Sequence, residues 1–303
     1  MNIGYCCINL SLNSLRKKKD FIQVNRGMVK KTFDSKGLSY VSDLSLLNLR
    51  DTMEILKWNL SNDILVYRMS SDSFPWMTEY EFLKLPRFDE IQSLLSKIGE
   101  FVKLNKMRVS YHPGPFNVLA SSNSAVVKKT IYELNQHSVL MDLMGLDQTT
   151  YYPINIHINT TQPNREEAAG RFCDNYKLLS ESCQKRLTVE NDDKISQYSV
   201  RMLYDLVHSK IGIPIVFDQL HFKYGPQDQS MEEALKMAMS TWKSRPITHM
   251  SSSRKIEDIS SKFTAHADLI YEKIEDFGMD FDVEIEAKSK DIAVLNYRSK
   301  FKV

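Results

Sequence analysis

Side chains that can bind metal ions follow a series of short apolar segments. Residues 214–217, Pro-Ile-Val-Phe, form a run typical of a strand buried on both faces, and Asp218 and His221 come soon after it. The same arrangement recurs in five other segments. Across the six segments, the residues at or just beyond the ends are His112, His157, Glu190, Asp218, His221, His249 and Glu286, and His266 lies in a later loop.

Together these residues are five of the seven histidines and three carboxylates. Such a set exceeds what one ion needs and fits two or three divalent cations, Mn²⁺ first by ligand type, with Zn²⁺ or Mg²⁺ as alternatives. The cluster suits hydrolysis of a phosphodiester, because one cation acidifies water into a nucleophile while its neighbours neutralise charge on the phosphate. A metal-dependent sugar isomerase is the main chemical alternative, although it would need fewer histidines.

The elements that would position these side chains are strands and helices in alternation. This order predicts a closed (β/α)8 TIM barrel, an α/β fold, in a single domain of residues 1–303. All strands of such a barrel run the same way, so their carboxyl ends bring the metal-binding residues to one face. The expected strands are residues 3–8, 64–69, 107–111, 153–158, 186–191, 214–217, 246–250 and 282–287. The expected helices are residues 44–60, 88–105, 126–146, 166–183, 196–210, 231–242 and 269–277.

The composition is that of a globular protein with a substantial core. Hydrophobic residues make up 42% of the chain, and a net charge of +2 neither demands nor excludes a polyanionic partner. The four cysteines form no C-x-x-C pair, so we expect reduced thiols. No apolar run reaches membrane-spanning length and the first residues lack a signal-peptide layout, so we expect a soluble protein of the cytoplasm with no membrane partner.

One segment is strongly basic. Between residues 16 and 36, eight basic side chains stand against two acidic ones, Asp20 and Asp34. In a barrel this segment would form the first strand-to-helix connection, on the face that carries the site. Either a solvated charge run or a phosphate-binding surface would explain it, and the second would suit a nucleic-acid substrate.

Six motifs occur in a defined order along the chain. They are Gly4-Tyr5 with Asn9, Tyr67-Arg68-Met69-Ser70-Ser71-Asp72, Ser110-Tyr111-His112-Pro113-Gly114, Glu190-Asn191-Asp192, Phe217-Asp218-Gln219-Leu220-His221 and Glu286-Ala287-Lys288-Ser289-Lys290. As a set, spanning about residues 2 to 295, they resemble the motifs of the UV damage endonuclease family. The resemblance implies a metal-dependent, ATP-independent repair enzyme that nicks double-stranded DNA 5′ of a UV photoproduct and leaves a 3′-hydroxyl.

The resemblance also implies roles for individual residues. Tyr5 and Asn9 would lie near the flipped-out lesion, whose extrusion is easier because the damage already weakens base pairing. Arg68 would contact phosphate, and Pro115 and Phe116 occupy the positions from which the family probes the duplex. The metal ligands would be His112, His157, Glu190, Asp218, His221, His249, His266 and Glu286, of which His112, Glu190, Asp218 and Glu286 would act directly in the reaction.

Two positions depart from the family pattern. Pro115 and Phe116 replace a glutamine and a tyrosine, which leaves an apolar probe whose phenyl ring can still wedge and stack. Ile247 stands where the family tends to have a lysine, often carboxylated, so a bridging anion is missing. Two other functions therefore stay open, an abasic-site endonuclease of the endonuclease IV type and a lesion-binding protein weakened in catalysis. In each case we expect a monomer.

Overall fold

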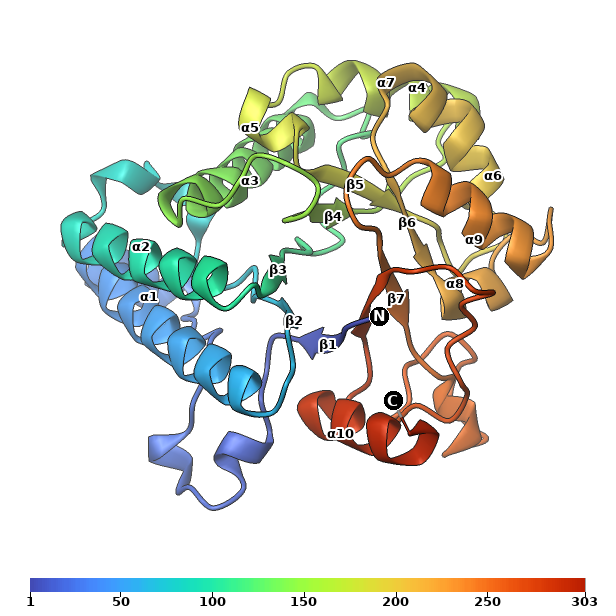
Figure 1. Cartoon of the computed structure of the whole chain (residues 1–303). Helices are drawn as coiled ribbons and strands as arrows, with labels where there is room; N and C mark the ends of the chain where they lie inside the picture. Colours follow the sequence, from blue (N-terminus) through green and yellow to red (C-terminus); the bar gives the residue numbers. More distant parts are fainter. Residues whose placement is uncertain (303) are drawn as a thin grey trace.

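Eight parallel strands form the centre of the protein, and helices surround them in the computed structural model, which describes residues 1–302 (Figure 1). The strands are β1 (Ile3–Cys6), β2 (Val66–Arg68), β3 (Arg108–Ser110), β4 (Ile154–Ile156), β5 (Leu187–Glu190), β6 (Ile215–Asp218), β7 (Ile247–Met250) and β8 (Asp282–Ile285). Their order in the sheet is β3-β2-β1-β8-β7-β6-β5-β4. Every residue of every strand is buried, so the polar residues within the strands, such as Arg108 in β3 and Glu284 in β8, are buried as well.

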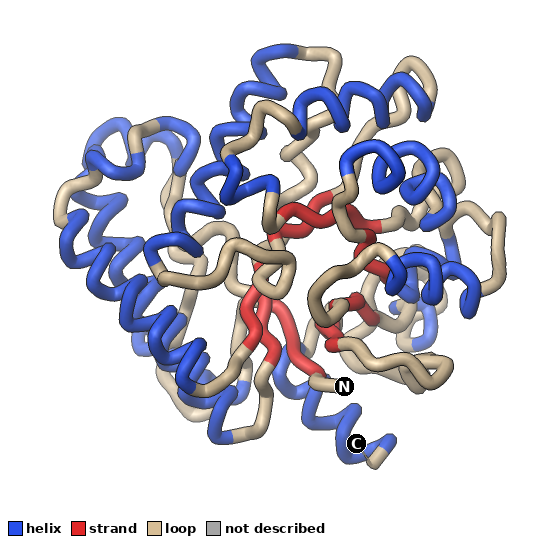
Figure 2. The backbone as a smooth tube through the Cα atoms, turned by 45° about the horizontal axis from the view of Figure 1, so that its top comes forward, coloured by secondary structure: helices blue, strands red, loops and turns tan. Residues whose placement is uncertain are grey.

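The two edges of this sheet, β3 and β4, meet through one isolated bridge between Tyr111 and Ile154. Two hydrogen bonds of Tyr111 make the contact. Its amide donates to Pro153 O at 3.0 Å, and its carbonyl accepts from Asn155 N at 2.9 Å. The strands therefore curve into a nearly closed ring (Figure 2), and the predicted (β/α)8 barrel class is confirmed.

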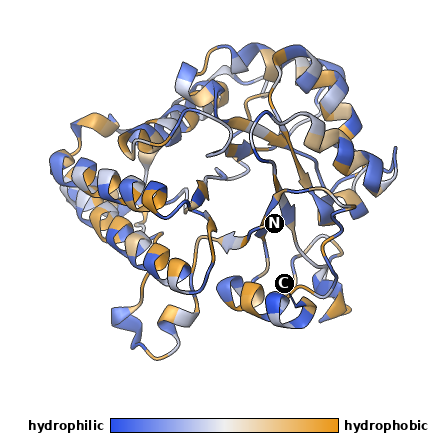
Figure 3. Cartoon of the chain, viewed as in Figure 1, coloured by the Kyte–Doolittle hydropathy of each residue, from blue (hydrophilic) through white to orange (hydrophobic). Residues whose placement is uncertain are grey.

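The helices cover the outside of this ring. They are α1 (Lys30–Ser61), α2 (Phe88–Leu104), α3 (Ser124–Leu143), α4 (Arg165–Tyr176), α5 (Glu181–Gln184), α6 (Val200–Leu203), α7 (Ser209–Ile211), α8 (Gln219–Tyr224), α9 (Met231–Ser240) and α10 (Lys290–Phe301). Apolar and polar residues mix along α1 and α2 (Figure 3). In α2 the buried positions include Ile91, Leu95, Ile98 and Val102, which is the spacing of one helical face. No helix among residues 1–302 is both long and apolar enough to span a bilayer.

Several helices differ from the expected ones. Helix α1 begins at Lys30 rather than near residue 44, and it bends at Gly37, whose φ of 64° is easiest for glycine. The expected helix 166–183 is divided into α4 and α5, and helix 196–210 begins at Val200 and contains a π-helical turn. The positions of α8 and α10 are not among the expected helices.

The expected helix 269–277 is wrong. Its backbone amides bond to distant parts of the chain instead of to carbonyls four residues earlier. Tyr271 N donates to Ser252 Oγ at 2.9 Å, and Ile274 N donates to the hydroxyl of Tyr297 at 3.0 Å. These contacts keep the segment a loop, because an amide that donates to one of these distant oxygens does not donate to the carbonyl four residues earlier, as a helix requires.

The inside of the barrel, below the carboxyl ends of the strands, is partly apolar and partly polar. Val66, Val216 and Ile247 come from β2, β6 and β7 and form a buried cluster with Trp242 beside it. Since β2 pairs with neither β6 nor β7, this cluster must lie across the interior. Ile247, the residue at the family's lysine position, thus takes part in apolar packing.

Candidate metal centre

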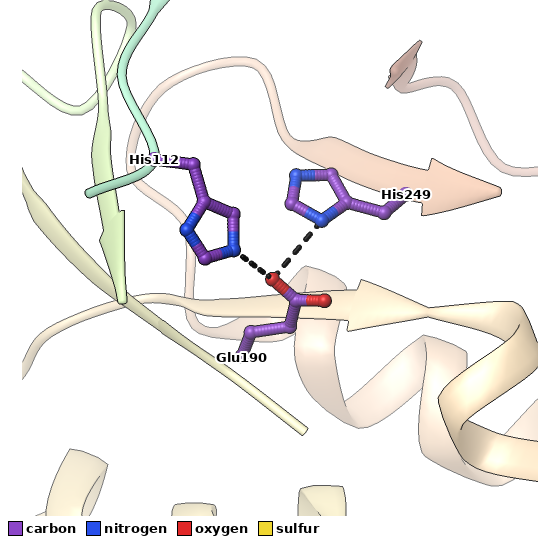
Figure 4. Close-up of side chains that lie close together, drawn as sticks. All are labelled: His112, Glu190 and His249. Atoms are coloured by element: carbon purple, nitrogen blue, oxygen red, sulfur yellow. Dashed lines mark hydrogen bonds and ion pairs between the residues drawn. The ribbon is translucent and has the colours of Figure 1, made fainter. Parts of the chain in front are cut away.

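Glu190, the last residue of β5, is the centre of the site. Its carboxylate is 1% exposed, and three imidazole nitrogens surround the oxygen Oε2. His249 Nδ1 lies at 3.0 Å, His112 Nε2 at 3.1 Å and His157 Nε2 at 3.6 Å. The side chains of His112 and His249 both point toward this oxygen (Figure 4). One carboxylate is therefore shared by rings from three other strand ends.

The other oxygen of Glu190 extends the cluster. Oε1 lies 3.1 Å from Nδ1 of His221. The ligand atoms form two groups, each within 4.8 Å, namely His112, Glu190 and His249, and His157, Glu190 and His221. Because Glu190 belongs to both groups, the arrangement matches two cations that share one carboxylate.

The remaining expected ligands join the same cluster. Asp218 Oδ1 lies 3.9 Å from His221 Nδ1, and Glu286 Oε1 lies 3.4 Å from His249 Nδ1. His266 Nδ1 is 3.7 Å from Glu286 Oε2. The structure thus brings all eight expected side chains into one connected group at the carboxyl ends of the strands.

Four of the five imidazoles have their Nδ1 atom next to an oxygen that belongs to neither of the two ligand groups, His112–Glu190–His249 and His157–Glu190–His221. This arrangement fixes the orientation of a metal-binding ring and leaves Nε2 free. The pairs are His112 with Pro113 O at 3.3 Å, His157 with Asp192 Oδ1 at 3.0 Å, His221 with Asn191 O at 3.0 Å and His266 with Glu286 O at 2.7 Å. Asp192, 4% exposed, has no role in the sequence-based expectations; its acidic side chain, two residues after Glu190, was the available signal.

Several buried polar atoms of the cluster lack a hydrogen-bond partner in the described part of the chain. They are Glu190 Oε1, Asp218 Oδ2, His157 Nδ1 and His249 Nδ1. The contact between Glu190 Oε1 and His221 does not satisfy the carboxylate, because that nitrogen bonds to Asn191 O. Buried acceptors without donors are unfavourable, and a cation would satisfy them. The donor set therefore fits bound divalent metal ions.

The carboxylates and imidazoles of the cluster shift each other's pKa values. Burial alone raises the pKa of Glu190, but the nearby imidazoles of His249 and His157 outweigh it and hold this pKa well below its usual range. Burial lowers the pKa of His249, yet Glu190 reverses this and raises it to about 10. Burial lowers the pKa of His112, which keeps that ring neutral, as a metal ligand must be.

The cluster opens into a cavity of about 300 Å³. Arg68, His112, Pro115, His157 and Glu286 are among the residues that line it. Pro115 is exposed at its rim, and the adjacent Phe116 is 91% exposed. The two residues expected to probe DNA therefore lie beside the opening of the metal cluster.

Tyr5 and Asn9 are placed differently from the expectation. Both are 0% exposed, and the hydroxyl of Tyr5 donates to Asn59 Oδ1 at 2.7 Å and accepts from Asn9 Nδ2 at 2.8 Å. Neither side chain has surface with which to contact DNA, so the structure does not place them at a lesion. Asn9 Oδ1 instead accepts from Leu12 N at 2.8 Å and shapes the start of the first connection.

Arg68 is also largely buried, at 7% exposure. Its Nε donates to Glu284 Oε2 at 2.7 Å, and its Nη1 pairs with Glu286. The guanidinium group is thus tied to two carboxylates inside the barrel, and only its edge at the cavity is available to a phosphate.

Comparison with known proteins agrees with this site. The family model described as UV-endonuclease UvdE matches residues 1–302. A UV DNA damage endonuclease of Clostridium perfringens is 31% identical, over 97% of this chain and 69% of that protein. One from Bacillus mycoides is 33% identical over 84% of this chain and 80% of that protein.

Solved structures give the same result. The crystal structure of SacUVDE is 30% identical and covers 100% of this chain and 98% of that one, with a TM-score of 0.86. A D-psicose 3-epimerase from Clostridium cellulolyticum covers 78% of this chain at 11% identity, with a TM-score of 0.55, and shares the fold alone. The resemblance seen in the motifs is confirmed. The chain belongs to the UV-endonuclease UvdE family, whose members are DNA repair endonucleases that act at UV photoproducts.

Proposed function

We propose that this protein is a metal-dependent, ATP-independent endonuclease that hydrolyses the phosphodiester bond 5′ of UV photoproducts in double-stranded DNA. The observation that carries the proposal is the buried Glu190 carboxylate, which four imidazoles approach at the carboxyl ends of the barrel strands. Membership of the UvdE family supplies the class of substrate. We further propose that the protein acts as a monomer in the cytoplasm, where its DNA substrate lies.

The charge of the cluster supports two resident divalent ions. Five buried or nearly buried carboxylates and one guanidinium leave a formal charge of −4, which two such ions would balance. The groups counted are Glu190, Asp192, Asp218, Glu284, Glu286 and Arg68. A third ion would need a further anion, which the substrate phosphate could supply. By ligand type we propose Mn²⁺ for both sites.

The proposed roles of the residues follow from the two groups. His112 and His249 would hold one ion with Glu190, and His157 and His221 would hold the other with the same carboxylate. When bound, the ions would acidify water and neutralise charge on the phosphate. The chain itself fixes the rings and keeps Glu190 away from bulk water, so the electrostatic interactions inside the site are strong.

Nicking of plasmid DNA tests the proposal. The purified protein with Mn²⁺ and without ATP is expected to convert UV-irradiated supercoiled plasmid to the open-circular form and to leave untreated plasmid intact. EDTA should stop the reaction and added Mn²⁺ should restore it, because the cluster needs its ions. Equal nicking of both plasmids would contradict the specificity for lesions.

The same assay separates the alternative functions. Cleavage restricted to a duplex with an abasic site would favour the endonuclease IV type, and binding without cleavage at every Mn²⁺ concentration would indicate a weakened enzyme.

Phe116→Ala is expected to weaken binding to UV-damaged duplex by about 5- to 150-fold, because stacking of an aromatic ring on a base contributes about 1–3 kcal/mol. The stability of the fold should not change, since the ring is 91% exposed. Fluorescence anisotropy with damaged and undamaged duplexes at one salt concentration measures the effect. Leu178→Ala is the matched control, because Leu178 is 63% exposed in the turn between α4 and α5, away from the strand ends. Equal affinity of Phe116→Ala and the unmodified protein would show that Phe116 does not contact the lesion.

A further inference from the structure

His249 approaches Oε2 of Glu190 differently from His112 and His157, which present Nε2 to this oxygen. Its Nδ1 atom, rather than Nε2, faces the cluster, at 3.0 Å from Glu190 and 3.4 Å from Glu286. Its Nε2 atom points into the barrel, where Glu284 Oε2 lies at 3.4 Å and Arg68 Nη2 at 2.8 Å. The orientation of this ring therefore depends on residues below the strand ends.

Glu284 is itself held in place from two directions. It lies on β8, is 1% exposed, and accepts hydrogen bonds from Ser110 Oγ through Oε1 and from Arg68 Nε through Oε2. Ser110 comes from β3, which does not pair with β8, so the three side chains meet inside the barrel. Both carboxylate oxygens thus have fixed partners.

A carboxylate at this depth is not needed to fill space. The positions two residues before the strand-end side chains of β2, β6 and β7 hold Val66, Val216 and Ile247, which pack against each other. Glu284 on β8 pairs in register with His249 on β7, and the positions two residues before His112, His157 and Glu190 also hold buried polar side chains, namely Ser110, Asn155 and Thr188. Glu284 is the charged one of these four side chains, and a buried charge is unfavourable unless it is paired, so its contacts point to an electrostatic task.

We propose that Glu284 is a positioning residue for His249. It holds Arg68 against Glu286 and lies 3.4 Å from His249 Nε2. In the structure Nε2 accepts from Arg68 Nη2, which can only donate. When Nδ1 binds the ion shared with His112 and Glu190, the ring carries its proton on Nε2, and Glu284 would accept that proton in a hydrogen bond. Metal-binding imidazoles commonly direct their second nitrogen to a carboxylate, and Asp192 has the equivalent position beside His157, 3.0 Å from its Nδ1. Each of the two proposed ions then has its own outer carboxylate, Glu284 for one and Asp192 for the other. This inference rests on the metal ligands of the proposed function.

Titration of the full-length protein with Mn²⁺, followed by electron paramagnetic resonance of the free ion, tests the inference without DNA. In a His221→Ala background the remaining site is the one with His249, and Glu284→Gln is expected to weaken Mn²⁺ binding there by about 10- to 100-fold. In a His249→Ala background the same substitution should change nothing. Asp192→Asn is the matched control and should show the opposite pattern.

The possible outcomes are distinct. Unchanged Mn²⁺ affinity for Glu284→Gln in the His221→Ala background would overturn the inference. Equal losses in both backgrounds would also overturn it, because they would show a general structural role. If Glu284→Gln does not fold, Ser110→Ala takes its place; a smaller loss of affinity in the His221→Ala background supports the inference and no loss overturns it. If the unmodified protein binds no Mn²⁺, the proposed function fails as well.

Discussion

Glu190→Gln is expected to lower the rate of nicking of UV-irradiated DNA by about 10³-fold or more. Glu190 is the residue common to both groups of ligand atoms, so its loss affects both proposed ions. A neutral amide cannot balance cations, and its nitrogen would face the imidazoles that now approach Oε2 at 3.0 to 3.6 Å. Binding to damaged duplex should persist, because the exposed rim residues are unchanged.

Single-turnover nicking assays measure this effect, and elemental analysis of the same samples should show fewer bound metal ions. Glu232→Gln is the control, since Glu232 lies in α9 on the outside of the barrel and is about half exposed. Thermal melting followed by circular dichroism separates loss of activity from loss of fold. A Glu190→Gln protein that nicks damaged plasmid at a rate close to that of the unmodified enzyme would remove Glu190 from the mechanism.

Arg108→Met is expected to lower the free energy of unfolding by about 3–5 kcal/mol, the range found when one partner of a buried ion pair is removed. Arg108 is 1% exposed at the other end of the barrel interior. Its Nη1 lies 3.2 Å from Asp282 Oδ2 and donates to Pro246 O at 2.9 Å, and its Nε donates to Tyr151 O at 2.8 Å. Methionine has similar volume but removes the donor to Tyr151 O and to Asp282 Oδ2, whereas Pro246 O keeps its hydrogen bond from Asp282 N.

Urea denaturation followed by tryptophan fluorescence measures this loss. Arg87→Met is the control, because Arg87 makes its ion pairs at the surface and such pairs contribute little to stability. The midpoint should shift for Arg108→Met and stay close to the unmodified value for Arg87→Met. Equal midpoints for the two variants would show that the buried network around Arg108 does not stabilise the barrel.

The strands could be predicted because each lies in a short segment rich in apolar and β-branched residues, of which β6 (Ile215–Asp218) is the clearest case. The helices were harder to predict. Residues 30–37 are mostly polar, so their sequence has no apolar period to mark the start of α1, and the amides of residues 269–277 bond to partners that only the fold brings near. The single-domain organisation of residues 1–303 stays a prediction.

The clustering of the eight expected metal ligands could be predicted because their positions follow from the strand ends, while their binding of metal stays a prediction. Glu284 could not, because its role depends on contacts with Ser110 and Arg68, which are 174 and 216 residues away in the sequence. Burial of Tyr5 and Asn9 depends in the same way on Asn59, a residue of α1. Sequence patterns locate residues along their own strand, whereas the roles of Glu284, Tyr5 and Asn9 depend on side chains from other elements that the fold brings next to them.

The junction between β3 and β4, which consists of one isolated bridge, has a consequence for the site. His112 follows β3 and His157 follows β4, and the two strands are joined by the Tyr111–Ile154 bridge rather than by a full ladder. Both rings approach the same oxygen of Glu190. Local opening of the barrel between β3 and β4 would separate these two rings. Ions bound on both sides of Glu190 would therefore oppose the opening, and the free energy of opening would rise with metal occupancy.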